Sequence, residues 1–329
     1  MEKNSYIAYL IDKGVHNDQI EYAMNEVEKL EQFLNERKTN LSTCSSDDIQ
    51  DYMDSLIYKG ENSLKGIILL SRYFLTQNNT AIYIYFTQLI GVSGVIENIM
   101  KRLKIAEEKM NLGSNLMKKV KILPIGSSPK KYPDFIKGFM NELKSVFDID
   151  EVRWILAGNN HQIPSKSFDD EKKRFIQADS IDDYLKERHE RAVRQLTKHA
   201  EEGTVWFEQI ITPEVVEYIR SNQEILGGIR RDNKIILTKI PYNPSEFLKS
   251  ENLSQKRYMA CHCPFIRQQL LHDFSDIDSD WCYCSGGFAK TPFEHIFEEE
   301  LEVELLESCL TGSDKCRFSI TIPKEYWNE

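Results

Sequence analysis

Six of the seven cysteines lie in the last 69 residues, and four of them form two matched pairs, Cys261-His262-Cys263 and Cys282-Tyr283-Cys284. Thiols are soft metal ligands, and as thiolates they are strong nucleophiles. On a strand, residues i and i+2 face the same side, so both thiols of each pair could turn toward one centre. The spacing predicts that the two pairs lie on strands and that the chemistry of the chain is concentrated here.

A metal site is the first hypothesis for these cysteines. Zinc takes four ligands in a tetrahedron and accepts thiolates readily. The expected ligands are the four paired thiols: Cys261, Cys263, Cys282 and Cys284. Cys316 and His262 are possible substitutes. Structural zinc sites usually use Cys-x2-Cys rather than Cys-x-Cys, so an inert alternative stays open, in which the thiols pack in the core as small hydrophobic groups. Cys44 stands alone and is expected to be inert.

A nucleophilic cysteine is the second hypothesis. Cys263 or Cys284 would be the nucleophile, and His262 or His295 would act as its base. Pro264 can open a helix, which would place Cys263 near a helix N-terminus. The positive end of the helix dipole favours a thiolate there, and we therefore expect a lowered pKa for Cys263.

A pair of glycines, Gly286-Gly287, follows the second cysteine pair. Because glycine lacks a Cβ, these residues could let the backbone approach a ligand or cofactor closely. A turn between a strand and a helix would explain the same residues, and this alternative stays open. The Gly-x4-Gly-Lys-Ser/Thr pattern of a phosphate loop is absent from the sequence.

Length and charge limit the classes of protein to which the chain can belong. Its 329 residues, 41% of them hydrophobic and 29% charged, predict two globular domains. The formal net charge of -10 disfavours binding to nucleic acid or anionic lipid. The N-terminus lacks the apolar core of an export signal, so we expect a cytoplasmic protein with reduced thiols.

The longest uncharged run of the chain ends at Ile96 and includes polar residues such as Gln77, Asn79 and Gln88. A membrane span needs about 20 predominantly apolar residues. The run therefore predicts a buried core helix, and we expect no membrane partner.

The N-terminal part of the chain follows a helical pattern. The apolar stripe of one helix recurs at spacings of three and four residues: Ile20, Ala23, Val27, Leu30 and Leu34. Ser45 and Asp48 predict a capping box, and Gly60 suits the left-handed end of that helix. A further helix is expected over about 80–109, and the first domain is expected to be a helical bundle over 1–110.

The C-terminal part mixes helices and strands. An amphipathic helix is expected after Pro133. From residue 225, two antiparallel hairpins are expected, around Asp232-Asn233 and Gly312-Ser313, with a helix over 291–297 before the second. Helices beside antiparallel hairpins indicate the α+β class, with a mixed domain over 111–329.

Residues 30–34, 46–52 and 64–74 resemble the helical core-binding (SAM-like) domain of tyrosine recombinases, which clamps DNA. In residues 1–110, however, 16 Asp/Glu outnumber 12 Lys/Arg. The resulting net negative charge disfavours binding to the phosphates of DNA. The recombinase set of Arg, His-x-x-Arg and Tyr is not found downstream. We therefore expect a structural or interaction bundle, with a protein partner or at most a weak DNA contact.

A second resemblance begins at Cys282. The cysteine precedes Gly287-Phe288, a strand pattern covers 303–308, and a final group follows: Gly312, Asp314, Cys316, Arg317 and Phe318. This order looks like the C-terminal part of vinyl-reductase-type small-molecule-binding domains, which also form the sensor part of some aromatic-responsive regulators. It is similar, too, to the aminothiazoline carboxylate hydrolase family. With 239–242 and 257–264, it also looks like an uncharacterised family of bacterial proteins with the same C-terminal module.

The resemblance implies that cysteines around the last hairpin hold zinc beside a ligand pocket, as they do in the sensor relatives. It implies Cys316 as the last ligand. The preceding family cysteine aligns with Ser308, and Cys309, displaced by one residue on a strand, is expected to face the opposite side. In the hydrolase relatives a cysteine is implicated in ring opening, although no complete catalytic set matches here.

The leading hypothesis is a cytoplasmic protein in which a helical bundle precedes a sensor-type module that binds a small apolar molecule and, through its cysteines, zinc. A thiol- or metal-dependent hydrolase is the first alternative. A DNA-binding adaptor built on the N-terminal helices is the second.

Overall fold

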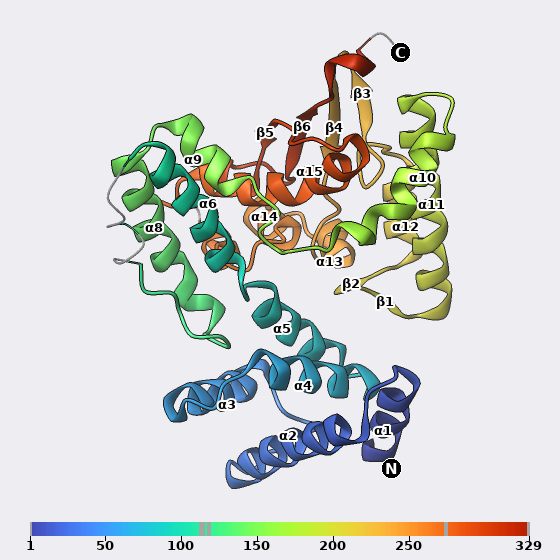
Figure 1. Cartoon of the computed structure of the whole chain (residues 1–329). Coiled ribbons are helices and arrows are strands. Elements are labelled where there is room, and N and C mark those ends of the chain that lie inside the picture. The colour runs from blue at the N-terminus through green and yellow to red at the C-terminus, as the bar shows by residue number, and fades with distance from the viewer. Residues whose placement is uncertain (1, 112–115, 117–119, 273–275, 328–329) are drawn as a thin grey trace. The chain divides into compact units, whose positions relative to one another are not determined.

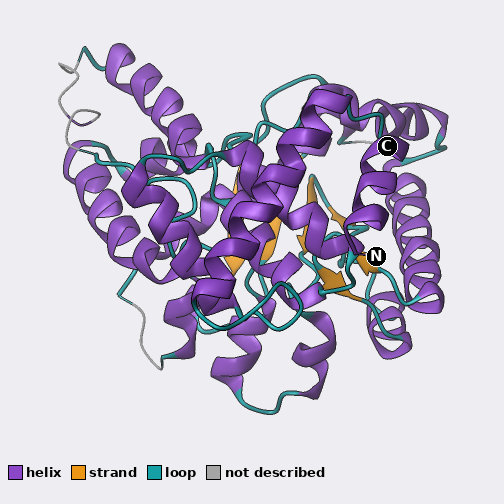
Figure 2. Ribbon diagram, turned by 90° about the horizontal axis from the view of Figure 1, so that it is seen from below, coloured by secondary structure: helices purple, strands orange, loops and turns teal. Residues whose placement is uncertain are grey.

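A computed structural model describes residues 2–111, 116, 120–272 and 276–327 (Figure 1). Most of the chain is helical (Figure 2), and the strands belong to its C-terminal part (Figure 1). The predicted α+β class, with a helical N-terminal region and antiparallel hairpins further on, is confirmed. The chain divides into two compact units, Met1–Ser93 with Ile122–Tyr132, and Gly94–Lys121 with Pro133–Glu329.

The first unit is a bundle of helices: α1 (Glu2–Asp12), α2 (Asn17–Glu36), α3 (Ser46–Lys59), α4 (Leu64–Thr76) and α5 (Thr80–Gly91). The predicted apolar stripe of α2 is buried in its core. The Ser45–Asp48 capping box is present, and Gly60 ends α3 in the left-handed conformation with φ of 71°. Both local predictions are confirmed because they depend on hydrogen bonds that neighbouring residues make among themselves.

A later segment, Ile122–Tyr132, returns to this bundle. Asn62 donates a hydrogen bond to the carbonyl of Ile125 at 2.9 Å, and Gln50 donates one to the carbonyl of Gly126 at 3.2 Å. Gly126 has φ of +85°, and a Cβ on it would lie 3.3 Å from the sulfur of Met53. The first unit therefore includes a segment that the expected domain 1–110 leaves out.

The helix expected over 80–109 is in fact two helices. α5 ends at Gly91, and α6 (Val95–Lys109) begins after Gly94, which has φ of 73°. Glycine tolerates this conformation, and the turn at 92–94 breaks the helix. α6 then packs against α9 in the second unit, so the chain leaves the first unit at Ser93 rather than near residue 110.

By length and composition, Thr80–Lys109 is apolar enough to cross a membrane, and among the described residues it is the only such stretch. Only 33% of its most apolar window is buried, so the expected buried core helix is buried over part of its surface only. The buried residues lie on one face of each short helix instead, including Phe86 on α5 and Ile99 on α6.

The second unit begins with further helices: α8 (Tyr132–Val146), α9 (Ile149–Leu156), η2 (Ser165–Phe168), α10 (Asp169–Gln177), α11 (Ile181–Glu202) and α12 (Pro213–Arg220). The helix predicted after Pro133 is α8, and most of its expected apolar face is buried. Between α11 and α12, β1 (Val205–Trp206) and β2 (Gln209–Ile210) form a small antiparallel hairpin. This hairpin contributes to the site described below.

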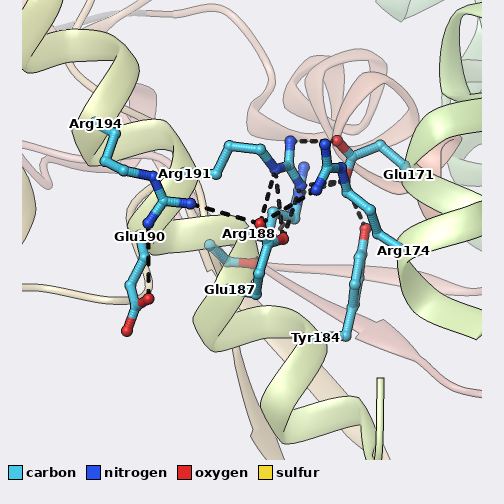
Figure 3. A network of polar contacts seen from close by, with 9 residues as sticks. Glu171, Arg174, Tyr184, Glu187, Arg188, Glu190, Arg191 and Arg194 are labelled. Atoms are coloured by element: carbon cyan, nitrogen blue, oxygen red, sulfur yellow. Dashed lines mark hydrogen bonds and ion pairs between the residues drawn. The ribbon is translucent and has the colours of Figure 1, made fainter. Parts of the chain in front are cut away.

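Charged side chains join α10 to α11 (Figure 3). Arg191 donates two hydrogen bonds to Glu171, at 2.6 and 3.1 Å, and the hydroxyl of Tyr184 donates a third at 2.8 Å. Burial opposes ionisation of Glu171, but these hydrogen bonds outweigh it and hold the pKa of the carboxyl below its ordinary value.

The C-terminal part contains one four-stranded antiparallel sheet in the order β3-β4-β6-β5. β3 (Ile229–Arg231) and β4 (Lys234–Thr238) form the hairpin predicted around Asp232-Asn233. β5 (Val303–Glu307) pairs with β6 (Arg317–Thr321), and β6 also pairs with β4. The short helix η5 (Cys309–Thr311) lies in the connection from β5 to β6.

Helical segments fill the connection from β4 to β5: α13 (Pro244–Lys249), α14 (Leu253–Ala260), η3 (Arg267–Leu271), η4 (Ser279–Cys282) and α15 (Tyr283–Phe297). The helix expected over 291–297 is the second half of α15. α15 contacts β5 and β6 and also α9 (Figure 1). The cysteines lie at the ends of these segments.

Candidate functional site: a cysteine-rich core and a buried polar cluster

The paired cysteines do not lie on strands, and this part of the prediction is wrong. Cys261 follows the last residue of α14, and Cys263 lies in the turn after it. Cys282 is the last residue of η4, and Cys284 lies in the first turn of α15. Runs this short carry no periodicity that could distinguish a strand from a helix end.

Helical backbone separates the second pair. Cys284 accepts a hydrogen bond from the Asn160 amide at 3.6 Å. Cys282 instead contacts Ser308 and lies within electrostatic range of Cys261 and Cys316. The i, i+2 spacing points side chains in different directions on a helix, so these two thiols cannot serve one centre as directly as they would from a strand.

Cys309 lies in the centre of the cysteine-rich core, against the expectation that it faces away. Its sulfur is 3.6 Å from that of Cys316, and Cys261 lies near enough to raise the pKa of Cys309. The expectation assumed a continuous strand, but Ser308 caps the short helix η5, and this turn redirects Cys309. We call the four thiols that gather here the sulfur quartet: Cys261, Cys282, Cys309 and Cys316.

Neighbouring contacts place the quartet. Arg257 of α14 is buried and donates to the carbonyl of Cys309 at 2.7 Å, which ties the end of α14 to η5. The backbone N–H of Lys239 donates to the carbonyl of Cys316 at 3.0 Å and extends the pairing of β4 with β6. Asp280 binds Lys144 at 2.6 Å and Arg153 at 3.0 Å, which fixes the segment that ends at Cys282.

Burial decides the protonation of most of these thiols. It raises the pKa of Cys263 and of Cys282 well above the ordinary value, and that of Cys284 to about 11. Cys316 is the exception, because a hydrogen bond from Cys309 lowers its pKa.

The two predicted nucleophiles are thus held as neutral thiols. For Cys263 the predicted lowering of the pKa is wrong, because η3 begins only at Arg267 and the thiol lies against the indole N–H of Trp281 at 3.3 Å. Cys284 is covered by Asn160. A thiol that stays protonated at neutral pH is a weak nucleophile.

The predicted bases have other partners. His262 hydrogen-bonds through Nε2 to the carbonyl of Ile240 at 2.6 Å, and burial lowers its pKa to about 3. His295 lies 3.0 Å from Asp169 at the start of α10. Neither histidine has a hydrogen bond to a cysteine among those of the described residues.

Gly286 and Gly287 belong to the first turns of α15 rather than to a turn before it. A Cβ on Gly287 would lie 2.4 Å from the carbonyl oxygen of Gly158 and 2.6 Å from the carbonyl carbon of Ala157. One on Gly286 would meet the methyls of Val303 at 3.3 Å. The close approach that Gly287 permits is therefore to the segment after α9, and not to a ligand.

The sulfur quartet fits a soft metal ion by chemistry, since four thiols from four separate elements gather in the dry interior. A zinc ion with tetrahedral Zn–S bonds of about 2.3 Å holds its sulfurs about 3.8 Å apart, close to the 3.6 Å between Cys309 and Cys316. Within the described part of the chain, no three His, Cys, Asp or Glu side chains already stand in an ion-holding arrangement. Binding would require the four sulfurs to close around the ion.

Beside the quartet lies a group of buried and half-buried polar residues, of which the sequence analysis identified only His262. We call it the polar cluster: Glu208, Gln209, Lys239, His262 and Arg267. Nδ1 of His262 is 3.9 Å from Oε1 of Glu208. The charges of Lys239 and Arg267 both act on His262 and on Glu208, whose pKa burial raises. The one feature of the sequence that could have revealed the cluster is Arg267, a cation with apolar residues on either side within 265–271.

A separate pocket of about 500 Å³ lies along α15, next to the segment after α9. Both of its Lys/Arg side chains are paired with carboxylates of the same pocket. Lys290 is 2.6 Å from Glu294, and Arg102 is 2.9 Å from Glu300. Because this pocket holds paired charges, the orphaned groups of the polar cluster make the stronger candidate site.

Residues 242–327 match a family of unknown function (DUF6144). The matched segment contains the whole sulfur quartet and Arg267. No curated protein and no solved structure matches the chain. The site therefore has to be interpreted from its own chemistry.

Proposed function

We propose that the second unit is a small-molecule-binding module of the sensor type, in which the sulfur quartet holds a soft metal ion such as zinc. The observation that carries this proposal is the convergence of Cys261, Cys282, Cys309 and Cys316 from four elements, with two sulfurs 3.6 Å apart. The resemblance to zinc-holding sensor modules supports the same assignment.

Metal binding explains the quartet better than inert packing does. An inert thiol packs well among hydrocarbon side chains, whereas the sulfur of Cys309 lies 3.6 Å from the sulfur of Cys316. When bound, the ion would supply a cross-link between α14, α15 and the β5–β6 connection. The residues of the chain would hold those elements together around the ligand site.

Several further observations support binding rather than catalysis. The expected nucleophiles, Cys263 and Cys284, are buried and protonated. The thiol-dependent hydrolase alternative therefore has less support than the sensor. All seven cysteines are free thiols, which fits a reducing compartment, and we accordingly propose the cytoplasm.

For the first unit we propose a structural or interaction role with a protein partner. Its acidic balance supports this choice over a DNA clamp. Undetectable or salt-insensitive binding of the full chain to duplex DNA is the expected result. Strong, salt-dependent binding would favour the adaptor alternative.

Elemental analysis of protein purified without oxygen tests the metal assignment. We expect about one zinc per chain, lost in Cys309→Ser and kept in Cys44→Ser, which alters a buried thiol in the first unit. Absence of metal from the wild type, with no rise in Tm when zinc is added to it, would reject the metal assignment. A thermal-shift screen with a diverse set of small molecules tests the binding role, and a screen without any hit would reject it.

A further inference from the structure

Arg267 is a buried cation that has no counter-charge among the residues that the structure describes. Its side chain is 2% exposed, and its guanidinium lies over the rings of Tyr242 and Tyr258, with centroid distances of 4.0 and 5.1 Å. Nε and Nη1 have no hydrogen-bond partner in the described part of the chain, and no carboxylate there lies within 4 Å of the guanidinium. Burying a guanidinium without acceptors is costly, so the arrangement favours a ligand that supplies them.

A second cation lies in the same cluster. Nζ of Lys239 donates to the hydroxyl of Ser285 at 3.0 Å and lies 5.0 Å from the ring centroid of Phe288. Among the described residues, no carboxylate forms an ion pair with it. Printed contacts aside, the two cations are connected: the Tyr242 ring beneath Arg267 lies 5.5 Å from the ring of His262, and His262 hydrogen-bonds to the carbonyl of Ile240, the residue after Lys239. The two cations therefore share one neighbourhood.

The charges of the cluster select the ligand's charge. Lys239 and Arg267 contribute two positive charges, and Glu208, whose Oε1 lies 3.9 Å from Nδ1 of His262, contributes at most one negative charge. With Glu208 ionised, the net charge of the polar cluster is about +1. A ligand with a single negative charge neutralises it. The planar fork of an arginine matches a carboxylate in both charge and geometry. A phosphate dianion would leave excess negative charge beside Glu208.

A hydrogen-bond acceptor lies in the same cluster. Gln209 is 1% exposed; its side chain hydrogen-bonds with Glu208, while its Oε1 has no partner among the described residues. On the β1–β2 hairpin, Gln209 is paired directly with Trp206, whose buried indole N–H likewise has no partner there. Directly paired residues project to the same face. The ligand should therefore carry a donor for Gln209 as well as an anionic group.

We propose that this module binds a small organic monocarboxylate that bears an amino or hydroxyl group. Arg267 holds the carboxylate, Lys239 supplies a second positive charge, and Oε1 of Gln209 accepts a hydrogen bond from the donor group. This replaces the expectation of an apolar ligand. The inference rests on the proposed function only for the statement that the module binds a small molecule, and it does not depend on the metal.

Calorimetric titration of the full chain with matched probes tests this inference. Glycolate and acetate differ by one hydroxyl, and phosphate serves as the competing anion. We expect glycolate to bind about two- to tenfold more tightly than acetate, as one neutral hydrogen bond allows. Phosphate should bind more weakly than either acid.

Two variants separate the two contacts. Arg267→Gln should weaken both acids by about tenfold or more, because a charge-assisted hydrogen bond is lost. Gln209→Met should leave acetate unchanged and remove the preference for glycolate. Arg220→Gln is the control, since Arg220 is an exposed arginine of α12 that pairs with Glu217. In the absence of ligand, Arg267→Gln should unfold close to the wild type, because the loss of the cation–π contacts with Tyr242 and Tyr258 is offset by the removal of a buried charge.

Three results would overturn the inference: no binding of either acid, unchanged binding by Arg267→Gln, or tighter binding of phosphate than of glycolate. If Arg267→Gln does not fold, the loss of glycolate preference in Gln209→Met decides instead. A different compound found in the thermal-shift screen, with both acids inactive, would leave the proposed function standing and remove only this ligand class. Failure of the screen and of both acids would remove both.

Discussion

Gly287→Ala should destabilise the second unit, because it places a methyl group inside the contact between α15 and the segment after α9. The new Cβ would lie 2.4 Å from the oxygen and 2.8 Å from the nitrogen of Gly158, and 2.6 Å from the carbonyl carbon of Ala157. All three atoms are backbone, so no side chain can rotate away. Overpacking of this kind costs typically 1–3 kcal/mol, occasionally more, and alanine returns about 1 kcal/mol through its helix propensity. Because the clashes are with backbone, the cost should lie at the upper end of this range, about 3 kcal/mol, and the net loss should be about 2 kcal/mol.

Gly286→Ala is the matched control on the same helix. Its Cβ would meet only side-chain atoms, Val303 at 3.3 Å and Phe318 at 3.4 Å, and the helix-propensity gain of about 1 kcal/mol should offset the crowding. All four tryptophans of the chain belong to the second unit. Tryptophan fluorescence during urea unfolding therefore reports the free energy of that unit alone.

Equal stability of the two variants would refute this packing argument. If Gly287→Ala unfolds like the wild type but no longer binds glycolate, the result would indicate that Gly287 contacts the ligand, as the sequence analysis allowed. A loss in both variants would mean that α15 tolerates no added methyl group in this turn, whatever the atom that it meets.

Three further predictions concern charge and sulfur. Glu224 accepts two hydrogen bonds from Arg317, which lower its pKa. Its stabilising contribution is complete above the unfolded pKa of about 4.5 and is lost as the pH falls through the folded pKa. Glu224→Gln should therefore weaken the pH dependence of the free energy of unfolding between about pH 5 and 3, measured by urea unfolding. Asp280→Asn weakens both ion pairs of that carboxylate and should cost about 1–3 kcal/mol at pH 7, measured by tryptophan fluorescence; an unchanged stability would contradict its anchoring role. Iodoacetamide should label Cys284 of the folded protein slowly, and rapid labelling would contradict its raised pKa.

Local hydrogen bonding could be predicted from the sequence. Ser45 with Asp48, Ser180 with Asp183, and Gly203 at the end of α11 all behave as their residue types indicate. Each of these motifs satisfies backbone groups within a few residues, so no knowledge of tertiary contacts is needed. The Asp232-Asn233 hairpin turn follows the same logic.

The site could be predicted only in outline. The cysteines do gather, but the set changes, because Cys263 and Cys284 lie against Trp281 and Asn160 while Cys309 joins the centre. Side-chain direction at helix ends depends on single backbone turns, which a run of two or three residues cannot specify. Arg267 could not be identified for a different reason. Its guanidinium lacks hydrogen-bond partners among the described residues, and only the folded structure can show this.

The return of Ile122–Tyr132 to the first bundle has a consequence during synthesis. At 5–20 residues per second, the ribosome needs about 2–8 s to add the residues between Ser93 and Tyr132. Throughout that interval the nascent bundle lacks the stretch that binds Gln50 and Asn62 and covers Met53. Its helices can form early, but the bundle closes only after the start of the next unit has been translated. A fragment cut at Ser93 would remain in that unfinished state permanently.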